Sequence, residues 1–206
     1  MIRFSAEDKS RITAAIHAAE KGTSGEFVAV VARAGDHYVF VPLVWAAIVA
    51  LLFPGACLLL GLPLRWVHLY QIQLLIFIVL AALFLFVPEL HIRLVPAHVK
   101  HVRASRLAKA QFYQQGVQLT PHHSGVLFFV SLAEHHVQIV ADKGIHDKLG
   151  EAHWQGIIEM FVGEVGRGRV VDGFVDAIGA CGAAMAEHYP PDPNDTNPLS
   201  DGLIEI

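Results

Sequence analysis

Residues 122–141 read HHSGVLFFVSLAEHHVQIVA, and this stretch decides the fold. Its first half, SGVLFFVSL, is apolar nearly throughout, which is typical of a central strand that is buried on both faces. The second half, HVQIVA, alternates in polarity with the period of two of a strand. The apolar face of this second run carries Val137, Ile139 and Ala141. Because the three residues 133–135 separate the two runs, the stretch predicts a β-hairpin.

Pairing across that turn sets Leu132 opposite His136 and places His122 opposite His146 at the open end of the β-hairpin. Potential metal ligands gather at this end: His122, His123, Asp142, His146 and Asp147. Imidazole and carboxylate groups bind Zn²⁺ and similar cations, so a divalent cation is the one cofactor that the sequence suggests. The alternative is that these are exposed loop residues at a sheet edge. At the turn, His135 and its neighbour are expected to be surface residues, with a pH-responsive contact as the alternative.

Common catalytic signatures are missing from the sequence. The chain has no HExxH, GxSxG, P-loop, CxxC or GxGxxG in the strand-to-helix context that each needs. Ser124 beside His123 is not a nucleophile pair, because adjacent residues of a strand point to opposite faces. The modest net charge of −4 argues against a general nucleic-acid-binding surface. We therefore expect no nucleic-acid partner, and the absent motifs favour a non-enzymatic role.

Two long uncharged runs lie at 39–62 and 69–88. As helices at 1.5 Å per residue, each is long enough to cross a hydrocarbon core of about 30 Å. Buried core helices are the alternative, but such helices in soluble proteins show a polar face, and these runs have little polar content on any face. Because the link between them is short, the helices should be antiparallel neighbours. The sequence therefore predicts a transmembrane hairpin over residues 37–90.

The distribution of basic residues sets the expected orientation of this hairpin. Basic residues occur in both flanks, at Arg33, Arg93, Lys100, Arg103 and Arg106. The link carries Arg65 alone. Because positive charge favours the cytoplasmic side, we expect both termini in the cytoplasm and a multi-pass protein of the inner (plasma) membrane with two spans. Cys57 and Cys181 form no disulfide framework and fit a reducing compartment.

The polar segments on either side of the hairpin, 1–36 and 91–188, are expected to form one domain. Ser5, with Asp8 three residues later, predicts a capped helix that ends at Gly22. The following run, TSGEFVAVVAR, is too apolar for a sheet covered on one face only. It therefore predicts a buried strand.

Three further helices are expected at about 97–115, 150–164 and 171–188. The membrane-proximal basic residues are Arg93, Lys100, Arg103, Arg106 and Lys109. These residues either contact anionic headgroups or form a solvated helix face. Residues 189–206 combine prolines and acids and predict a disordered tail, with a docking peptide that uses its closing apolar residues as the alternative.

Three sequence words, in this order, resemble the TPM domain family, which is named after thylakoid lumen, photosystem II repair and receptor-modulator proteins. They are TSGEFVAVVAR, SGVLFFVSLAEHHVQIVADKGIHDKLG and GRVVDGFVDAIGACG. The chain is similar to a membrane-anchored bacterial member, with the transmembrane hairpin as an insertion. The resemblance implies an α/β sandwich with a small central sheet flanked by helices. It also implies, for some members, a weak acid-phosphatase activity or divalent-cation binding at an acidic cluster.

The chain departs from the family pattern at the residues that matter for that chemistry. Typical members carry Asp-Asn-Gly before the apolar strand, where this chain has His123, Ser124 and Gly125. They often carry two arginines at the turn, where this chain has His135 and His136. The later glycine-rich turn keeps one acid, Asp142. Loss of the first acid argues against an all-oxygen calcium site and leaves a histidine-containing site open.

Two functions from different classes follow. The first is a membrane-anchored, cytoplasm-facing interaction domain that assists the assembly, maintenance or regulation of a membrane protein complex. Its partners would be the lipid bilayer and another membrane protein, with a homo-oligomer as a further option. The second is a metal-dependent, acid-phosphatase-like hydrolase, in which the cation polarises a phosphoryl oxygen and Arg167 or Arg169 stabilises charge. The missing motifs favour the first.

Overall fold

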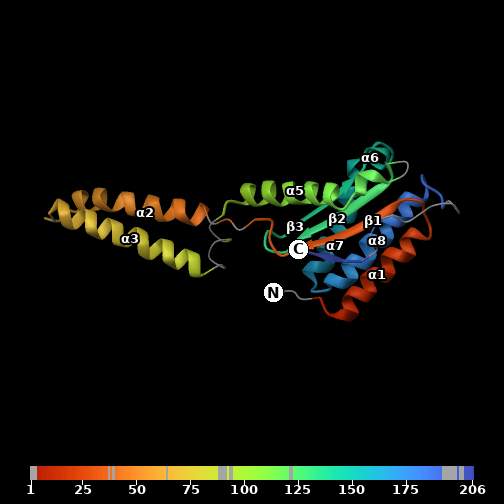
Figure 1. Cartoon of the computed structure of the whole chain (residues 1–206), viewed down its shortest axis with the longest axis horizontal. Helices are drawn as coiled ribbons and strands as arrows, with labels where there is room; N and C mark the ends of the chain where they lie inside the picture. Colours follow the sequence, from red (N-terminus) through yellow and green to blue (C-terminus); the bar gives the residue numbers. More distant parts are fainter. Residues whose placement is uncertain are drawn as a thin grey trace. The chain divides into compact units, whose positions relative to one another are not determined.

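The chain forms two compact units, Met1–Gly35 with Val102–Ile206 and Asp36–His101. The computed structural model describes residues 4–36, 38, 40–63, 65–87, 92, 95–120, 123–191, 199 and 202–206. The first unit contains a sheet covered by helices, and the second contains two long helices (Figure 1).

A four-stranded mixed sheet with the order β3-β2-β1-β4 forms the centre of the first unit. Strand β1 (Glu26–Ala32) runs parallel to β2 (Gly125–Ser131). Strand β3 (His136–Ala141) is antiparallel to β2, and β4 (Ile204–Glu205) runs parallel to the other edge of β1. The predicted α/β class, with a small central sheet flanked by helices, is confirmed.

Every residue of β1 and β2 is buried, as expected for strands that are apolar on both faces. One face of the two strands contributes to the larger core through Phe27, Ala29, Val31, Val126, Phe128 and Val130. The other face contributes to a second core through Val28, Val30, Ala32, Leu127 and Phe129. The strict alternation explains why neither strand has a polar side.

Helices α1 (Ala6–Glu20), α7 (Glu151–Gly166) and α8 (Val170–Ala186) cover the face of the larger core (Figure 1). Helix α1 begins where the sequence predicts, because Ser5 and Asp8 form a capping box. The Asp8 amide donates to the Ser5 hydroxyl at 3.1 Å, and the Ser5 amide donates to the Asp8 carboxylate at 2.8 Å. These hydrogen bonds also lower the pKa of Asp8 below its ordinary value.

Helix α5 (Ala97–Gln114) covers the opposite face with Ala108 and Phe112, and a short 3₁₀ turn, η1 (Val117–Leu119), follows it. The helix ends before Gly116, whose φ of 73° is left-handed. This termination agrees with the predicted stop, since glycine adopts that conformation without a Cβ penalty.

The β-hairpin register differs from the predicted one by one residue. Ser131 pairs with His136, so four residues, 132–135, form the turn in place of three. The observed register places Val130 opposite Val137 and lets both side chains face the larger core. The predicted register is wrong because a one-residue shift would set apolar side chains opposite polar ones. The predicted alternation of the second strand itself is confirmed.

The described residues include three elements that the sequence did not suggest: η1, helix α6 (Lys143–Leu149) and strand β4. The last of these corrects the prediction of a disordered tail for residues 202–206, whereas residues 192–198, 200 and 201 of that tail lie outside the described part of the chain. Leu203 and Ile204 pack against the two cores, and the Ile206 amide donates to the Val31 carbonyl at 3.0 Å. The closing apolar residues therefore return to the sheet, because the edge of β1 offers backbone partners that a disordered segment lacks.

The second unit is a helical hairpin, formed by α2 (Phe40–Leu59) and α3 (Trp66–Phe86) packed against each other. Both helices are long and apolar enough to cross a membrane. Helix α3, which the structure describes in full, has no buried residue. Its apolar side chains are left for another apolar phase to cover.

Candidate functional site

At the open end of the β-hairpin, one imidazole meets one carboxylate. The Nδ1 atom of His123 lies 3.1 Å from Oδ2 of Asp142. Asp142 is also the N-cap of α6, where its other oxygen accepts the Lys143 amide at 2.6 Å. Its side chain is only 13% exposed, whereas that of His123 is 71% exposed. The pair therefore consists of an anchored carboxylate and an imidazole that is open to solvent.

The backbone fixes this pair in an unusual conformation. His123 has a φ of 52°, in the left-handed region that few residues other than glycine adopt. The next residue, Ser124, is buried, and its hydroxyl donates to the Ser24 carbonyl at 3.3 Å. At Gly125, a Cβ would lie 2.4 Å from the Val117 carbonyl oxygen. The motif before β2 thus serves close packing, and only its first residue is free to meet a ligand.

Among the described residues, the other predicted ligands do not join this pair. His146 and Asp147 lie on α6 with exposed side chains, and His122 lies outside the described residues. Within the described part of the chain, no three His, Cys, Asp or Glu side chains come close enough together to hold a metal ion. The donors that the described residues bring together at this end are one histidine and one aspartate. The five-residue set stays a prediction.

The arginines proposed to assist this site belong to the opposite end of the β-hairpin. Gly166, the first residue of the GRGR loop, and Val170, which follows the loop, line the same cavity as His135 and His136 at the turn. The register places that turn at the far end of β2 from Asp142. The expectation that Arg167 or Arg169 stabilises charge beside His123 is therefore not supported.

Both arginines of the loop bind Glu164 at the end of α7. The Arg169 guanidinium donates to the two Glu164 oxygens at 2.6 and 2.9 Å, and Arg167 donates at 2.6 Å. Hydrogen bonding from Arg169 and then from Arg167 lowers the pKa of Glu164, and Glu164 in turn raises the pKa of Arg169. These contacts indicate that the two arginines hold the loop against the end of α7.

A buried carboxylate at the turn end escaped the sequence prediction. Glu134 is 7% exposed; it accepts the Gly35 amide at 2.9 Å and the Ser131 hydroxyl. A Cβ on Gly35 would lie 3.1 Å from the backbone of Ala104 in α5. Glu134 therefore fixes the point at which the chain leaves the sheet for the helical hairpin. An acid inside a stretch as apolar as 124–141 is the signal that could have revealed it.

The turn also borders an apolar cavity of about 290 Å³ beneath α7. Apolar side chains that line it include Val130, Val137, Phe161, Val165 and Val170. His135, whose φ is 51°, and His136 contribute imidazoles to its wall. His135 is exposed and His136 is half-buried, in broad agreement with the predicted surface position.

The predicted basic residues do not share one helix face. On α5, Lys100 and Arg103 are half-buried, whereas Arg106 and Lys109 are exposed. Residues three apart are displaced by about 60° around an α-helix, so the series winds around it. Arg93 lies outside the described residues. A headgroup contact by this set stays a prediction.

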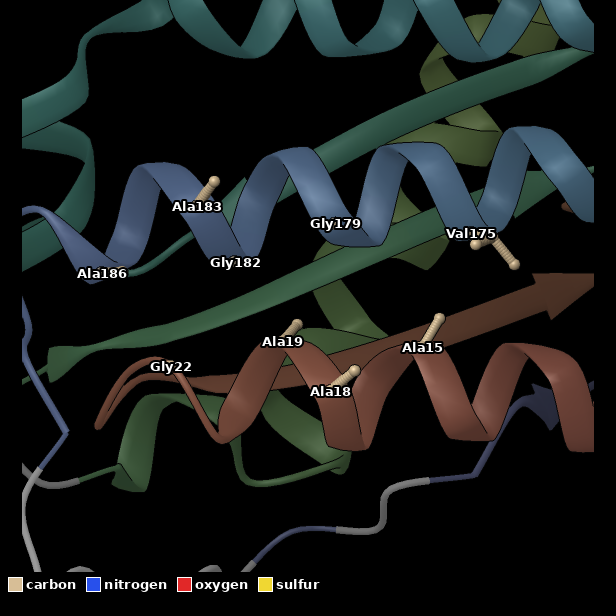
Figure 2. Close-up of a pocket in the computed structure, with 9 residues that line it drawn as sticks. All are labelled: Ala15, Ala18, Ala19, Gly22, Val175, Gly179, Gly182, Ala183 and Ala186. Atoms are coloured by element: carbon tan, nitrogen blue, oxygen red, sulfur yellow. The ribbon is translucent and has the colours of Figure 1, made fainter.

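A second cavity, of about 330 Å³, lies between α1 and α8 and is bordered by alanines, glycines and Val175 (Figure 2). Figure 2 shows Ala15, Ala18 and Ala19 on α1 beside Gly179, Gly182 and Ala183 on α8. A Cβ on Gly182 would lie 2.6 Å from the Ala19 Cβ, whereas one on Gly179 would meet nothing within 4 Å. The small residues thus permit close helix packing, and the hollow follows from their size.

Comparisons with known proteins agree with this geometry. The solution NMR structure of BA42 protein, from the psychrophilic bacterium Bizionia argentinensis, superposes with a TM-score of 0.63 at 18% sequence identity. The match covers 100% of this chain and 97% of BA42, and it shows a shared fold. No curated protein matches the chain. The model of the TPM domain family matches residues 89–184, and the structure completes that region with α1 and β1. The chain therefore carries a TPM domain, as its sequence words predict.

Proposed function

We propose that this protein is a membrane-anchored, cytoplasm-facing TPM domain that assists the assembly, maintenance or regulation of a membrane protein complex. The observation that carries the proposal is the helical hairpin inserted between β1 and α5. An exposed apolar surface of this length is unstable in water, because burial of apolar area is the main driving force of folding. A lipid bilayer is the apolar phase that matches helices of 20 and 21 residues.

The exposure of individual side chains supports a lipid-facing hairpin. Leu59 is 89% exposed, Phe86 is 84% exposed, and Leu58 is 82% exposed. Neither helix contains a charged residue. Trp66 and Tyr70, which are also exposed, lie at the start of α3, where aromatic side chains favour the headgroup region.

The attachment of the hairpin supports a domain held near the bilayer. The chain leaves the sheet at Ala32, and α2 begins at Phe40, so eight residue steps separate them. An extended chain of that length spans at most about 28 Å. Because Glu134 binds the Gly35 amide, the exit is fixed rather than loose. A short, fixed tether raises the effective concentration of the domain for membrane partners.

Photo-crosslinking in membranes tests this function. A photoreactive residue at exposed Leu119 or Tyr113 of the first unit should give a discrete crosslink to a membrane protein. A matched chain with a flexible linker in place of residues 37–90 should remain soluble and lose the crosslink. Equal crosslinking from the soluble chain would contradict a role for anchoring, and retention of that chain in the membrane fraction would contradict the hairpin as the anchor.

A second candidate is the metal-dependent, acid-phosphatase-like hydrolase, favoured by the His123–Asp142 pair. The half-buried carboxylate would orient the imidazole, which would then serve as a base or as one metal ligand. Hydrolysis of a generic phosphate ester with Zn²⁺, Mg²⁺ or Ca²⁺ should then disappear in His123→Ala/Asp142→Ala. The same double variant should leave crosslinking unchanged if the first function holds. Metal-dependent turnover that the double variant abolishes would instead establish the hydrolase.

A further inference from the structure

The outer edge of β1 is held by the chain's own C-terminal residues. β4 pairs with Val30 and Val31. Beyond this pairing, the Arg33 amide donates to the Ile206 carbonyl at 2.8 Å, and the Ile206 amide donates to the Val31 carbonyl at 3.0 Å. Without these partners, β1 would present an open row of amides and carbonyls, which is a template for another strand.

Side chains of the closing segment show what chemistry this edge accepts. Leu203 packs on the larger core and Ile204 packs on the second core, so successive residues fit opposite faces of the sheet. Glu205 forms an ion pair with Lys9 of α1 at 3.2 Å. The edge thus selects an extended segment that is apolar on both faces and carries an acid near Lys9.

The closing segment fills this edge incompletely. On its inner edge β1 pairs with β2 over seven residues, whereas on its outer edge the described residues of the closing segment contribute the two residues of β4. Nearer the start of β1, the Phe27 amide donates to the Glu20 side chain at 3.2 Å. Ile206 remains 42% exposed, and the ion pair of Glu205 with Lys9 is open to solvent. A longer strand would form more ladder bonds than β4 and could displace it.

The direction of pairing restricts the source of such a strand. β4 runs parallel to β1, and β1 leads at its carboxyl end to the first helix of the hairpin. A partner strand with the same direction also ends at that edge of the sheet. The geometry therefore fits a segment that precedes a membrane span in its own chain.

We propose that the outer edge of β1 is a strand-acceptor site for the juxtamembrane segment of a membrane partner, and that β4 occupies the site until the partner binds. The partner segment is extended, longer than β4 and apolar on both faces, with an acid at the position of Glu205. This inference deepens the proposed function and rests on it. A second copy of this chain is a weaker candidate. Its tail is identical, so it would form no more backbone hydrogen bonds with β1 than the chain's own tail already does.

Peptide binding to the full chain in detergent tests the site. The probes are a fluorescent peptide of residues 198–206 and a version with Asp201→Thr/Gly202→Val, which lengthens the β-forming stretch. In the variant Ile204→Asp/Ile206→Pro, called the released variant below, the tail loses its apolar contact and a backbone hydrogen-bond donor. The variant Ile204→Val/Ile206→Val is the matched control. We expect the released variant to bind the first peptide at least about tenfold more tightly than the control, and the lengthened peptide more tightly again.

Hydrogen exchange at the Arg33 amide gives a second readout. This amide should exchange at least about tenfold faster in the released variant and regain protection when the peptide binds, while the amides of β2 stay protected as evidence of folding. Lys9→Glu, added to the released variant, should weaken binding of the peptide, because Lys9 pairs with Glu205. A peptide that carries Glu205→Lys should bind this Lys9→Glu chain with restored affinity. Two results would overturn the site. One is an Arg33 amide that stays protected from exchange in the released variant without peptide, and the other is a released variant that binds neither peptide.

The crosslinking experiment separates failure of this site from failure of the proposed function. A membrane crosslink that persists in the full chain while the peptides fail to bind overturns the strand-acceptor site and leaves the proposed function standing. Loss of the crosslink to the released variant upon addition of the lengthened peptide supports the site, because the peptide then competes with the partner. Absence of any crosslink from the intact chain overturns the proposed function.

Discussion

Strand β2 and helix α3 both lack charged residues, yet the structure buries all of one and none of the other. β2 has seven residues and lies between two strands and under helices on both faces, so protein covers every side chain. α3 has 21 residues and packs against α2, and no residue of it is buried. Apolar composition therefore fixes that a segment avoids water, whereas its length and its neighbours decide whether protein or lipid replaces the water.

The largest difference between the two regions should appear when a phenylalanine ring is removed from each. Phe128 is fully buried and contacts Phe161 and Phe174 edge-to-face at centroid distances of 5.1 and 5.5 Å. Phe128→Ala should lower the free energy of unfolding by about 3–5 kcal/mol, because a cavity replaces the ring. Phe86→Ala, at an 84% exposed site, is the control and should leave unfolding of the sheet unit nearly unchanged. Denaturant titration in detergent measures both, and equal losses would contradict the contrast.

A charge in the middle of α3 should act through membrane insertion instead. Val79, which is 54% exposed, lies near the centre of that helix, and Val79→Arg should cost about 2.5–3.5 kcal/mol of insertion free energy. The measurement is the fraction of protein retained in membranes after alkaline extraction. Gln71→Arg, near the start of α3, is the control, because a long basic side chain there reaches the headgroups. A membrane fraction that is insensitive to Val79→Arg would show that α3 does not cross the bilayer.

Close packing within the sheet unit allows a finer test. Gly182→Ala places a Cβ 2.6 Å from that of Ala19, so α1 and α8 must separate, at a cost of about 1–3 kcal/mol of unfolding free energy. Gly179→Ala, on the same helix with open space around it, should instead stabilise by about 0.5–1 kcal/mol, since alanine favours helix. Thermal unfolding of both variants checks the opposite signs. If both variants were stabilised, α1 and α8 could separate to admit the new Cβ without loss of stability, which would contradict the close packing.

The smallest expected effect concerns the cap of α1. Ser5→Ala removes the hydroxyl that accepts the Asp8 amide and should cost about 1 kcal/mol. Because the capping box lowers the pKa of Asp8 from 3.8, the contribution of its carboxylate is present above that pH and is lost as the pH falls through the folded pKa. Unfolding of Asp8→Asn should accordingly depend less on pH between about 5 and 2 than that of the unchanged chain. An identical pH dependence would contradict the capping box.

Local signals anticipated much of the fold. The Ser5–Asp8 cap, the stop at Gly116 and the alternation of β3 each depend on residues within a few positions of one another. The β-hairpin register failed by one residue, because a turn of three or four residues satisfies the local pattern equally well. The packing of Val130 and Val137 into the larger core decides between them, and that core is built by helices distant in the sequence.

The candidate site was less predictable than the fold. The sequence brought His123 and Asp142 to one end, and the structure places them 3.1 Å apart. It did not reveal that the GRGR loop lies at the other end of the β-hairpin, beside His135. The position of that loop depends on how α7 and α8 pack across the sheet, which no spacing along the chain encodes.

The sequence by itself determined which segments avoid water, where α1 is capped and that an apolar helical hairpin separates the two parts of one α/β unit. These properties follow from side-chain polarity and from backbone preferences of neighbouring residues. Only the tertiary structure decided that Glu134 fastens the Gly35 amide and that residues 204–206 close the edge of β1. Both contacts join residues about a hundred or more positions apart, and each depends on backbone groups, which every sequence carries: the Gly35 amide in the first, and amides and carbonyls of both segments in the second.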